Sequence, residues 1–497
     1  IVIGSKNMLM KVYEISGGKG FRTVDEIRYE YELGKEAYFT RKITFAQIEE
    51  ICNVLMEFQQ RMREYAITEF RCYATSAIRN AKNQVSVLNQ IKIRTGVDVI
   101  MLSNSELRFL MYKGIQVLDI DFNKIIEKNT AILDIGSGSV QVSLFDKQAL
   151  YMTQNLDIGT VKVRGFLESV ENNVLDYISV LEEYIQYEFD MFKSGYLKDK
   201  DIKNVIAIGD EIKNINRLIP ELHLTDTMSY EQILYIYKKI KKASYQDIAL
   251  KYGLSIEDAR MVLPSVLIYK TFLERSKCAT NLCDGSVVDY AQETKKIKLS
   301  HDFYQDIVAS AKYIGKRYRY SKVHAQYITD LALEIFDKTK KFHGLTQRDR
   351  LILEISAILH DIGKYVNLND PGKNGYQLII STEIMGLSHR EREEVANIVL
   401  YNTQELPDTD ELDTAFWREE YLRIAKLSSI LRLANALDRG HKQKLEKCSM
   451  ARKGKELIIS LETNQDITLE ITRFSKKAET FSEFTGITPV LKQKRAL

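Results

Sequence analysis

The chain has 497 residues, a formal net charge of +3 and an apolar fraction of 45%. This length is too great for one hydrophobic core, so we expect two to four domains. No apolar run reaches the roughly 18 residues of a membrane-spanning helix, and the near-neutral charge argues against a dedicated nucleic-acid binder. The five cysteines lack paired spacing, which predicts a reducing, cytoplasmic compartment without a disulfide framework.

Residues 1–125 alternate predicted strands and helices. The chain opens with a strand, a turn at Gly4 and Ser5, and a second strand that ends near Tyr13. The later predicted elements are a helix over 44–65, strands over 70–75 and 97–102, and a helix over 105–117. This order predicts a first α/β domain.

A second strand-turn-strand segment, Thr130 to Phe145, opens the next region, residues 126–299. Asp134 ends its first apolar run, and Gly136, Ser137, Gly138 and Ser139 form the turn. Backbone N–H groups in such a turn can bind phosphate, and a carboxylate oxygen suits Mg²⁺. An ordinary tight hairpin is the alternative. Further on we predict helices over 173–192, 242–253 and 256–273, with Ser255 as an N-cap, and a strand over 205–209.

From His301 the pattern changes to long amphipathic helices with few prolines, so we expect an all-α domain over residues 300–446. A small α+β domain over 447–497 follows. There we predict strands over 456–463 and 466–472 around a turn at Asn464, and a helix over 476–484.

The two turn segments and three further motifs resemble the exopolyphosphatase/guanosine pentaphosphate phosphatase (Ppx/GppA) family. The motifs are Tyr73 to Asn83 (YATSAIRNAKN), Ser103 to Arg108 (SNSELR) and Asn155 to Arg164 (NLDIGTVKVR). The resemblance implies two ribonuclease H-like domains of the actin/sugar-kinase superfamily. It implies that Glu106 is the general base for the attacking water and that Asp134 orients water or Mg²⁺. The phosphate-binding residues it implies are Gly4, Ser5, Lys6, Arg79, Gly136, Ser137, Gly138 and Ser139.

Simpler roles exist for two of these residues. Glu106 could be an acid at a helix N-terminus, where the helix dipole favours it, and Arg79 could form a surface ion pair. The sequence also departs from the family pattern. Val2, Lys6, Ser137 and Gln141 replace an acid, an Asn, a Gly and a Glu, and Gly209-Asp210-Glu211-Ile212 replaces a glycine-rich strand end. We expect the lost carboxylates to weaken metal binding.

In the helical region, His324, the pair His360-Asp361, and Asp438 follow the H…HD…D order of the metal-dependent HD phosphohydrolase fold. Two imidazoles and two carboxylates predict a mixed N/O site for a second divalent metal. A vestigial, metal-free site is the alternative. His343 and His389 lie among charged residues, which predicts that both are solvated.

The resemblance implies a phosphohydrolase that releases terminal phosphate from inorganic polyphosphate or guanosine pentaphosphate with Mg²⁺. It also implies a homodimer, with neither membrane nor nucleic acid as a partner. Two alternatives stay open. One is a catalytically degenerate polyphosphate or (p)ppGpp-binding protein, and the other is a metal-dependent HD-domain phosphodiesterase.

Overall fold

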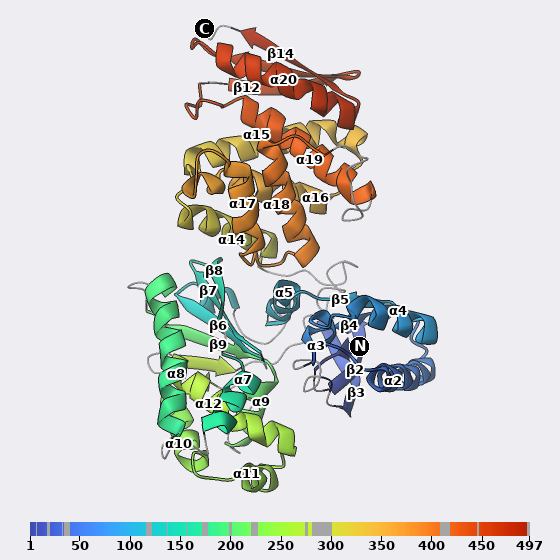
Figure 1. Cartoon of the computed structure of the whole chain (residues 1–497), viewed down its shortest axis with the longest axis vertical. Coiled ribbons are helices and arrows are strands. Elements are labelled where there is room, and N and C mark those ends of the chain that lie inside the picture. Colours follow the sequence, from blue (N-terminus) through green and yellow to red (C-terminus); the bar gives the residue numbers. More distant parts are fainter. Residues whose placement is uncertain are drawn as a thin grey trace. The chain divides into compact units, whose positions relative to one another are not determined.

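The computed structural model divides into two compact units, Ile1–Phe303 and Tyr304–Leu497 (Figure 1). The structure describes residues 1–5, 7–16, 20–31, 33, 40–115, 122–136, 138–156, 158–170, 177–197, 201–219, 227–273, 277–280, 301–407, 418–444 and 447–494.

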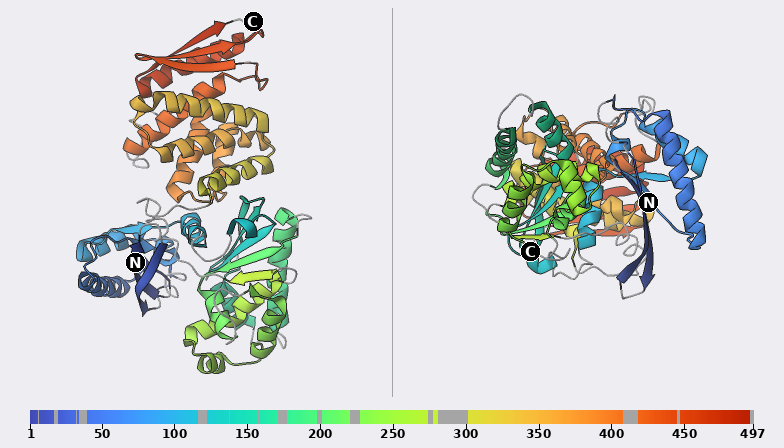
Figure 2. Two further views of the ribbon diagram at one scale, coloured as in Figure 1. Left: turned by 180° about the vertical axis from the view of Figure 1, so that it is seen from behind. Right: turned by 90° about the horizontal axis from the view of Figure 1, so that it is seen from below.

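The first sheet has the strand order β3-β2-β1-β4-β5. Its strands are β1 (Val2–Ile3), β2 (Asn7–Ser16), β3 (Gly20–Glu30), β4 (Cys72–Ala74) and β5 (Val99–Met101). The first three pair antiparallel, and β4 and β5 continue the sheet in parallel. Figure 2 shows the β2–β3 ribbon extending beyond the shorter strands. The helices here are α2 (Phe45–Glu64), α3 (Ser76–Arg79), α4 (Gln84–Thr95), α5 (Asn104–Ile115) and α6 (Phe122–Ile125).

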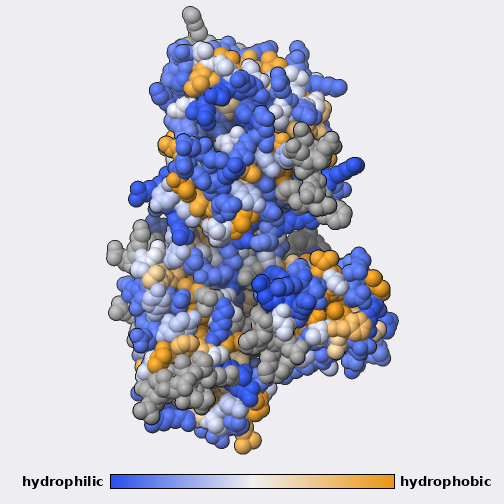
Figure 3. Space-filling model, viewed as in Figure 1, coloured by the Kyte–Doolittle hydropathy of each residue, from blue (hydrophilic) through white to orange (hydrophobic). Residues whose placement is uncertain are grey.

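Helix α2 shows why the sequence folds this way locally. Thr44 caps its N-terminus in a reciprocal capping box with Gln47, and Ile51 and Leu55 on one face are buried. The opposite face of α2 exposes apolar side chains to solvent. Figure 3 shows hydrophobic side chains over the lobe that carries α2 and α4, where Phe45 and Ile93 are exposed.

The second sheet has the order β10-β11-β9-β6-β7-β8. Its strands are β6 (Thr130–Ile135), β7 (Val140–Asp146), β8 (Ala149–Leu156), β9 (Asn204–Ile208), β10 (Thr227–Met228) and β11 (Lys277–Thr280). Strands β8-β7-β6-β9-β11 repeat the pairing of β3-β2-β1-β4-β5: two antiparallel pairs, then two parallel pairs. The helical elements are α7 (Thr160–Val170), α8 (Tyr177–Phe192), η1 (Lys193–Leu197), α9 (Asp210–Arg217), α10 (Tyr230–Ile240), α11 (Tyr245–Tyr252) and α12 (Ile256–Leu273).

The second unit begins with helices and ends with a three-stranded sheet, order β12-β13-β14. The helices are α14 (Phe303–Arg317), α15 (Lys322–His343), α16 (Gln347–Leu359), η2 (Ile362–Tyr365), α17 (Pro371–Ile380), α18 (His389–Thr403) and α19 (Arg418–Ala436). Then come β12 (Lys447–Lys453), β13 (Glu456–Glu462), α20 (Thr468–Thr485) and β14 (Thr488–Lys494). In Figures 1 and 2, α20 lies along the sheet. Within the described ranges, no helix is long and apolar enough to cross a bilayer.

The predicted strand over 466–472 is wrong, because this segment starts helix α20. The alternation of Ile467, Leu469 and Ile471 suggested a strand, but Leu469 and Ile471 are exposed. The buried positions Ile467, Glu470 and Phe474 instead follow the helical period. The hairpin in this region joins β12 to β13, and its turn lies at Gly454, whose φ of +61° suits glycine. The hairpin turn predicted at Asn464 is therefore wrong.

Candidate functional site

The two strand-turn-strand segments are closed in the same way. In the first turn the Gly4 N–H donates to the Asn7 carbonyl at 2.9 Å, and in the second the Gly136 N–H donates to the Ser139 carbonyl at 3.0 Å. A Cβ on Gly4 would lie 2.8 Å from the Asn7 oxygen, so only glycine fits there. The same turn, closed by a hydrogen bond between residues i and i+3, therefore occurs twice in the chain.

Strand register identifies the matching positions of the two copies. Val2 pairs with Leu9 across the first turn, and Asp134 pairs with Gln141 across the second, in both cases seven residues apart. The acid at the second turn thus has an apolar residue as its counterpart in the first. The prediction that Val2 replaces a carboxylate agrees with this register.

Several contacts hold the first turn in place. The Tyr31 hydroxyl donates to the Gly4 carbonyl at 2.8 Å, and the hydroxyls of Ser5 and Ser76 lie 3.0 Å apart. Ser76 begins α3, so the turn is tied to the next parallel strand-helix connection. Two predicted phosphate-binding residues, Lys6 and Ser137, lie outside the described residues.

Arg79 and Glu106 both lie at the entry to helix α5. The Arg79 guanidinium donates to the Leu102 carbonyl at 2.7 Å, directly before α5 begins. Ser103 caps the helix: its hydroxyl accepts the Glu106 N–H at 3.1 Å, and Glu106 Oε2 accepts the Ser103 N–H at 2.9 Å. Glu106 is therefore the acid of a capping box, and this contact fixes where its carboxylate lies.

Helix α5 also reaches the second turn. Arg108 Nε lies 2.9 Å from Asp134 Oδ2, and their side chains are only 5% and 14% exposed. One turn further along, the Tyr112 hydroxyl donates to Ser143 on β7 at 2.6 Å. The structure thus brings Arg108, which lies two residues after Glu106 in α5, into contact with Asp134. Arg108 is the last residue of the motif Ser103 to Arg108, but the sequence assigns it no role. Its partner Asp134 is evident only once α5 is placed in the structure.

The residues that follow β9 support the second turn. Gly209 has a φ of +104° and precedes α9, and a Cβ on it would lie 3.5 Å from Asp134 Oδ1. Glu211 is 5% exposed and accepts hydrogen bonds from Thr160 and Ser265. Because the Thr160 N–H donates to the Gly136 carbonyl, this buried carboxylate braces the second turn.

Among the residues that the structure describes at the second turn, Asp134 is the carboxylate offered to Mg²⁺, and its Oδ2 already contacts Arg108. Mg²⁺ is commonly bound by one or two carboxylates together with substrate phosphates and water. These residues therefore fit an ion carried largely by a phosphate substrate, with Asp134 as its protein ligand.

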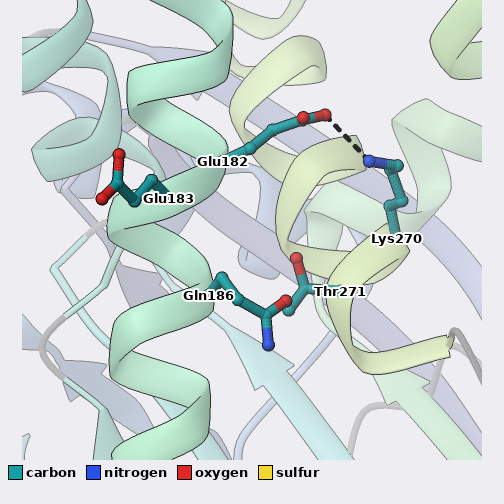
Figure 4. A pocket seen from close by; sticks show the side chains of 5 residues that line it. All are labelled: Glu182, Glu183, Gln186, Lys270 and Thr271. Carbon is teal, nitrogen blue, oxygen red and sulfur yellow. Dashed lines mark hydrogen bonds and ion pairs between the residues drawn. The ribbon is translucent and has the colours of Figure 1, made fainter.

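A separate hollow of about 260 Å³ lies between α8 and α12 (Figure 4). Glu182, Glu183, Gln186, Lys270 and Thr271 line it, and Lys270 Nζ contacts Glu182 at 2.8 Å. Because its one cation is already paired and a second acid is close by, the hollow is a poor phosphate site.

In the second unit the predicted HD residues come together. His324 Nε2 lies 3.2 Å from His360 Nε2, and the Asp361 carboxylate lies 3.7 Å from His324 and 3.5 Å from His360. Asp438 Oδ2 lies behind this group, 2.7 Å from His324 Nδ1. Burial lowers the pKa of His360, and although burial opposes it, neighbouring His360 and Lys364 lower the pKa of Asp361 to about 2.

Two further residues complete this cluster, and the sequence interpretation missed both. His441 stacks on His324 with ring centroids 3.5 Å apart, and its Nε2 lies 3.4 Å from Asp361 Oδ2. The Lys364 ammonium contacts Asp361 Oδ2 at 2.6 Å and His441 Nε2 at 3.2 Å. His324, Asp361 and His441 form a group that could hold a metal ion. The sequence signal for both is their position three residues after an Asp of the motif, Asp361 for Lys364 and Asp438 for His441.

Two other histidines were predicted to be solvated. His389 is exposed at the start of α18, which confirms that prediction. His343 is 1% exposed, so the prediction for it is wrong. Its Nε2 contacts the Phe336 carbonyl at 3.0 Å, and its Nδ1 accepts the Leu345 N–H. The buried imidazole therefore binds backbone groups at the C-terminal end of α15.

Comparisons with known proteins agree with the repeated sheet and its turns. Residues 11–287, more than half of the chain, match the Ppx/GppA phosphatase family, and residues 308–477 match Ppx/GppA phosphatase, domain III. A guanosine-5'-triphosphate,3'-diphosphate pyrophosphatase of Photobacterium profundum is 21% identical over 454 residues, 87% of this chain and 86% of the relative.

A bifunctional 3-dehydroquinate synthase/phosphatase of Fusobacterium nucleatum is 26% identical over 134 residues, 27% of this chain and 20% of the relative. Among solved structures, an exopolyphosphatase from Cytophaga hutchinsonii has a TM-score of 0.50 and 16% identity. The match covers 59% of this chain and 97% of that one, and it shows the shared actin-like fold.

Proposed function

The chain belongs to the Ppx/GppA phosphatase family, and from this premise we propose that it is a phosphohydrolase acting on phosphoanhydrides. The proposed substrates are inorganic polyphosphate and guanosine pentaphosphate, from which it releases the terminal phosphate. The names of the Photobacterium and Cytophaga relatives support these two substrates. We also propose that the protein works in the cytoplasm as a homodimer.

One observation supports the proposal: helix α5 carries the proposed base and also contacts the strand that ends at the second glycine turn. Glu106 lies in the first turn of the helix, and two residues later Arg108 contacts Asp134. A carboxylate there is stabilised by the N–H groups of the helix N-terminus. The start of α5 thus carries both the proposed base and a guanidinium that contacts Asp134 next to the second turn.

In the proposed step, Glu106 accepts a proton from water as the water oxygen bonds to the terminal phosphorus. The bond from phosphorus to the bridging oxygen breaks, and the leaving phosphate chain takes its electrons. Arg79 and the two turns hold phosphate oxygens. Mg²⁺, when bound with the substrate at Asp134, would neutralise phosphate charge.

The test is phosphate release from long-chain polyphosphate and from guanosine pentaphosphate by wild type and Glu106→Gln, with and without Mg²⁺. Glutamine at this position keeps the capping box, so the helix start should persist. Loss of a general base typically costs about 10²- to 10⁴-fold in rate, and we expect a loss in that range.

The matched control is Glu391→Gln. Glu391 forms the same capping box with Ser388 in the second unit, and the variant should keep full activity. Undiminished phosphate release by Glu106→Gln would refute the mechanism. Tight polyphosphate binding without release by wild type would instead support a catalytically degenerate binding protein, which the apolar Val2 counterpart of Asp134 favours.

A further inference from the structure

A buried arginine on helix α19 lacks a counter-charge. Arg432 is 7% exposed, and no carboxylate among the described residues lies within ion-pair distance of it. Its Nη1 donates to the Gln404 carbonyl at 3.3 Å, and its Nε is buried without a hydrogen-bond partner. Asn402, which contacts Asn435 one turn along α19, also has a buried Nδ2 without a partner. Because a buried charge is normally compensated by an opposite charge, Arg432 needs an explanation.

The packing of α19 on α20 determines what faces this arginine (Figure 1). At the start of α19, the ring centroids of Tyr421 and Phe484 lie 6.3 Å apart. Just beyond the other end of α19, a Cβ on Gly440 would lie 3.5 Å from Glu470 Oε1. The two helices are therefore antiparallel, and Arg432, near the middle of this overlap, faces the middle of α20.

A lysine occupies this middle position on the inward side of α20. Phe474 and Phe481 are 3% and 0% exposed. Lys477 lies three residues after the first and four before the second, so it belongs to the same side of the helix. Burial, followed by the charges of Arg432 and Arg473, lowers the pKa of Lys477 to about 8. Two cations therefore approach each other between packed helices, and neither has an ion pair with a described residue.

Further cations lie on the solvent side of this pair. Arg473 precedes Lys477 by one turn of α20, Arg439 follows the end of α19, and both arginines are exposed. Burial lowers the pKa of Arg432, and the exposed acid Glu405 opposes the shift for both Arg432 and Lys477. Among the described residues, positive charge thus exceeds negative charge around a partly buried place. Such a place attracts an anion.

We propose that Arg432, Lys477 and Arg473 bind a phosphate group between α19 and α20. Arg432 forms the closed end of the site, and Arg473 lies at its solvent side. Phosphate oxygens accept several hydrogen bonds at once, so they suit the donors at Arg432 Nε and Asn402 Nδ2 that lack acceptors. Free phosphate and the end of a phosphate chain share this chemistry. The site lies in the second unit and does not depend on the activity proposed for Glu106.

The test is native-state hydrogen exchange of the full chain, read on peptides from α19 and α20, in inorganic phosphate and in chloride at equal ionic strength. Phosphate at about ten times its Kd should slow exchange in both helices by about tenfold, because only the folded site binds it. Methylenediphosphonate, which cannot be hydrolysed, represents the end of a phosphate chain. A larger effect of this compound than of phosphate would identify a chain end as the preferred ligand, and a smaller one would identify free phosphate. Peptides from β6 and β7 report separately on binding in the first unit.

Three variants make the assignment specific. Lys477→Met should lose the protection by phosphate although it is the more stable protein in chloride, because the repulsion of facing cations is gone. Misfolding cannot explain such a loss. Glu405→Gln should tighten phosphate binding by about two- to tenfold, because a like charge is removed. The matched control Lys476→Met changes the exposed neighbour on the same helix and should keep the protection. Absence of protection in wild type, or equal protection in wild type and Lys477→Met, would overturn the site.

Discussion

The buried ion pair between Arg108 and Asp134 allows a quantitative prediction. The two side chains are 5% and 14% exposed and their atoms lie 2.9 Å apart. At an effective dielectric constant near 20, two charges about 4 Å apart attract by about 4 kcal/mol. Desolvation offsets part of this attraction, but removal of one partner leaves a buried charge and costs about 3 to 5 kcal/mol.

We therefore expect Arg108→Met to lower the free energy of opening at β6 and β7 by about 3 kcal/mol. Asp134→Asn should cost a similar amount, because it leaves the guanidinium buried without its counter-charge. The double variant should cost clearly less than the sum of the two, with a coupling energy of about 2 kcal/mol.

Native-state hydrogen exchange with mass spectrometry on peptides from β6 and β7 is the suitable assay. The chain has two compact units, so a single global unfolding curve would mix their transitions. The control cycle uses Arg61 and Glu64, which lie 2.8 Å apart with side chains 58% and 49% exposed. That pair should show a coupling of about 0.5 kcal/mol or less, measured at α2. Similar coupling in both cycles would refute the argument from burial.

Two other predictions concern buried ionisable side chains, and a third concerns the first turn. Burial raises the pKa of Glu394 to about 7 despite Arg423, so the folded state binds more protons than the unfolded state between the two pKa values. Stability of the second unit should fall by about 1 to 3 kcal/mol as pH rises from 4.5 to 7.5, and Glu394→Gln should flatten that slope in native-state hydrogen exchange of second-unit peptides. Burial, then Arg432 and Arg473, lower the pKa of Lys477 to about 8. Lys477→Met should therefore stabilise the second unit by about 1 kcal/mol at pH 7, and the gain should shrink above pH 8 in the same assay. Val2→Asp should lower the Mg²⁺ concentration needed for half-maximal phosphate release; an unchanged requirement would refute a role for the first turn in metal binding.

The elements around the site could be predicted because their signals are local. Glycine turns between alternating runs indicated both hairpins, and the apolar spacing of α2 indicated a helix; the structure confirms these. The strand predicted over 466–472 failed because three alternating apolar residues fit either period, and only packing shows which side chains are buried.

The functional contacts that were missed are long-range. Arg108 lies 26 residues from Asp134, and His441 lies 80 residues from Asp361. Local patterns contain Arg108 and lie close to His441, but they show the residue types without their long-range partners. Arg108 becomes meaningful once α5 packs on the second sheet, and His441 once its loop adopts positive φ angles.

The two turns share their backbone geometry and differ in charge. Backbone geometry is retained in both copies, since Gly4 and Gly136 close their turns with the same hydrogen bond and the strands keep the same register. Charge is retained in only one. At the second turn Asp134 is balanced by Arg108, so the pair is nearly neutral and adds no repulsion toward a phosphate. At the first turn Val2 has no charge to balance. If both turns bind phosphate as proposed, the charge balance among the described residues there favours phosphate binding over metal binding.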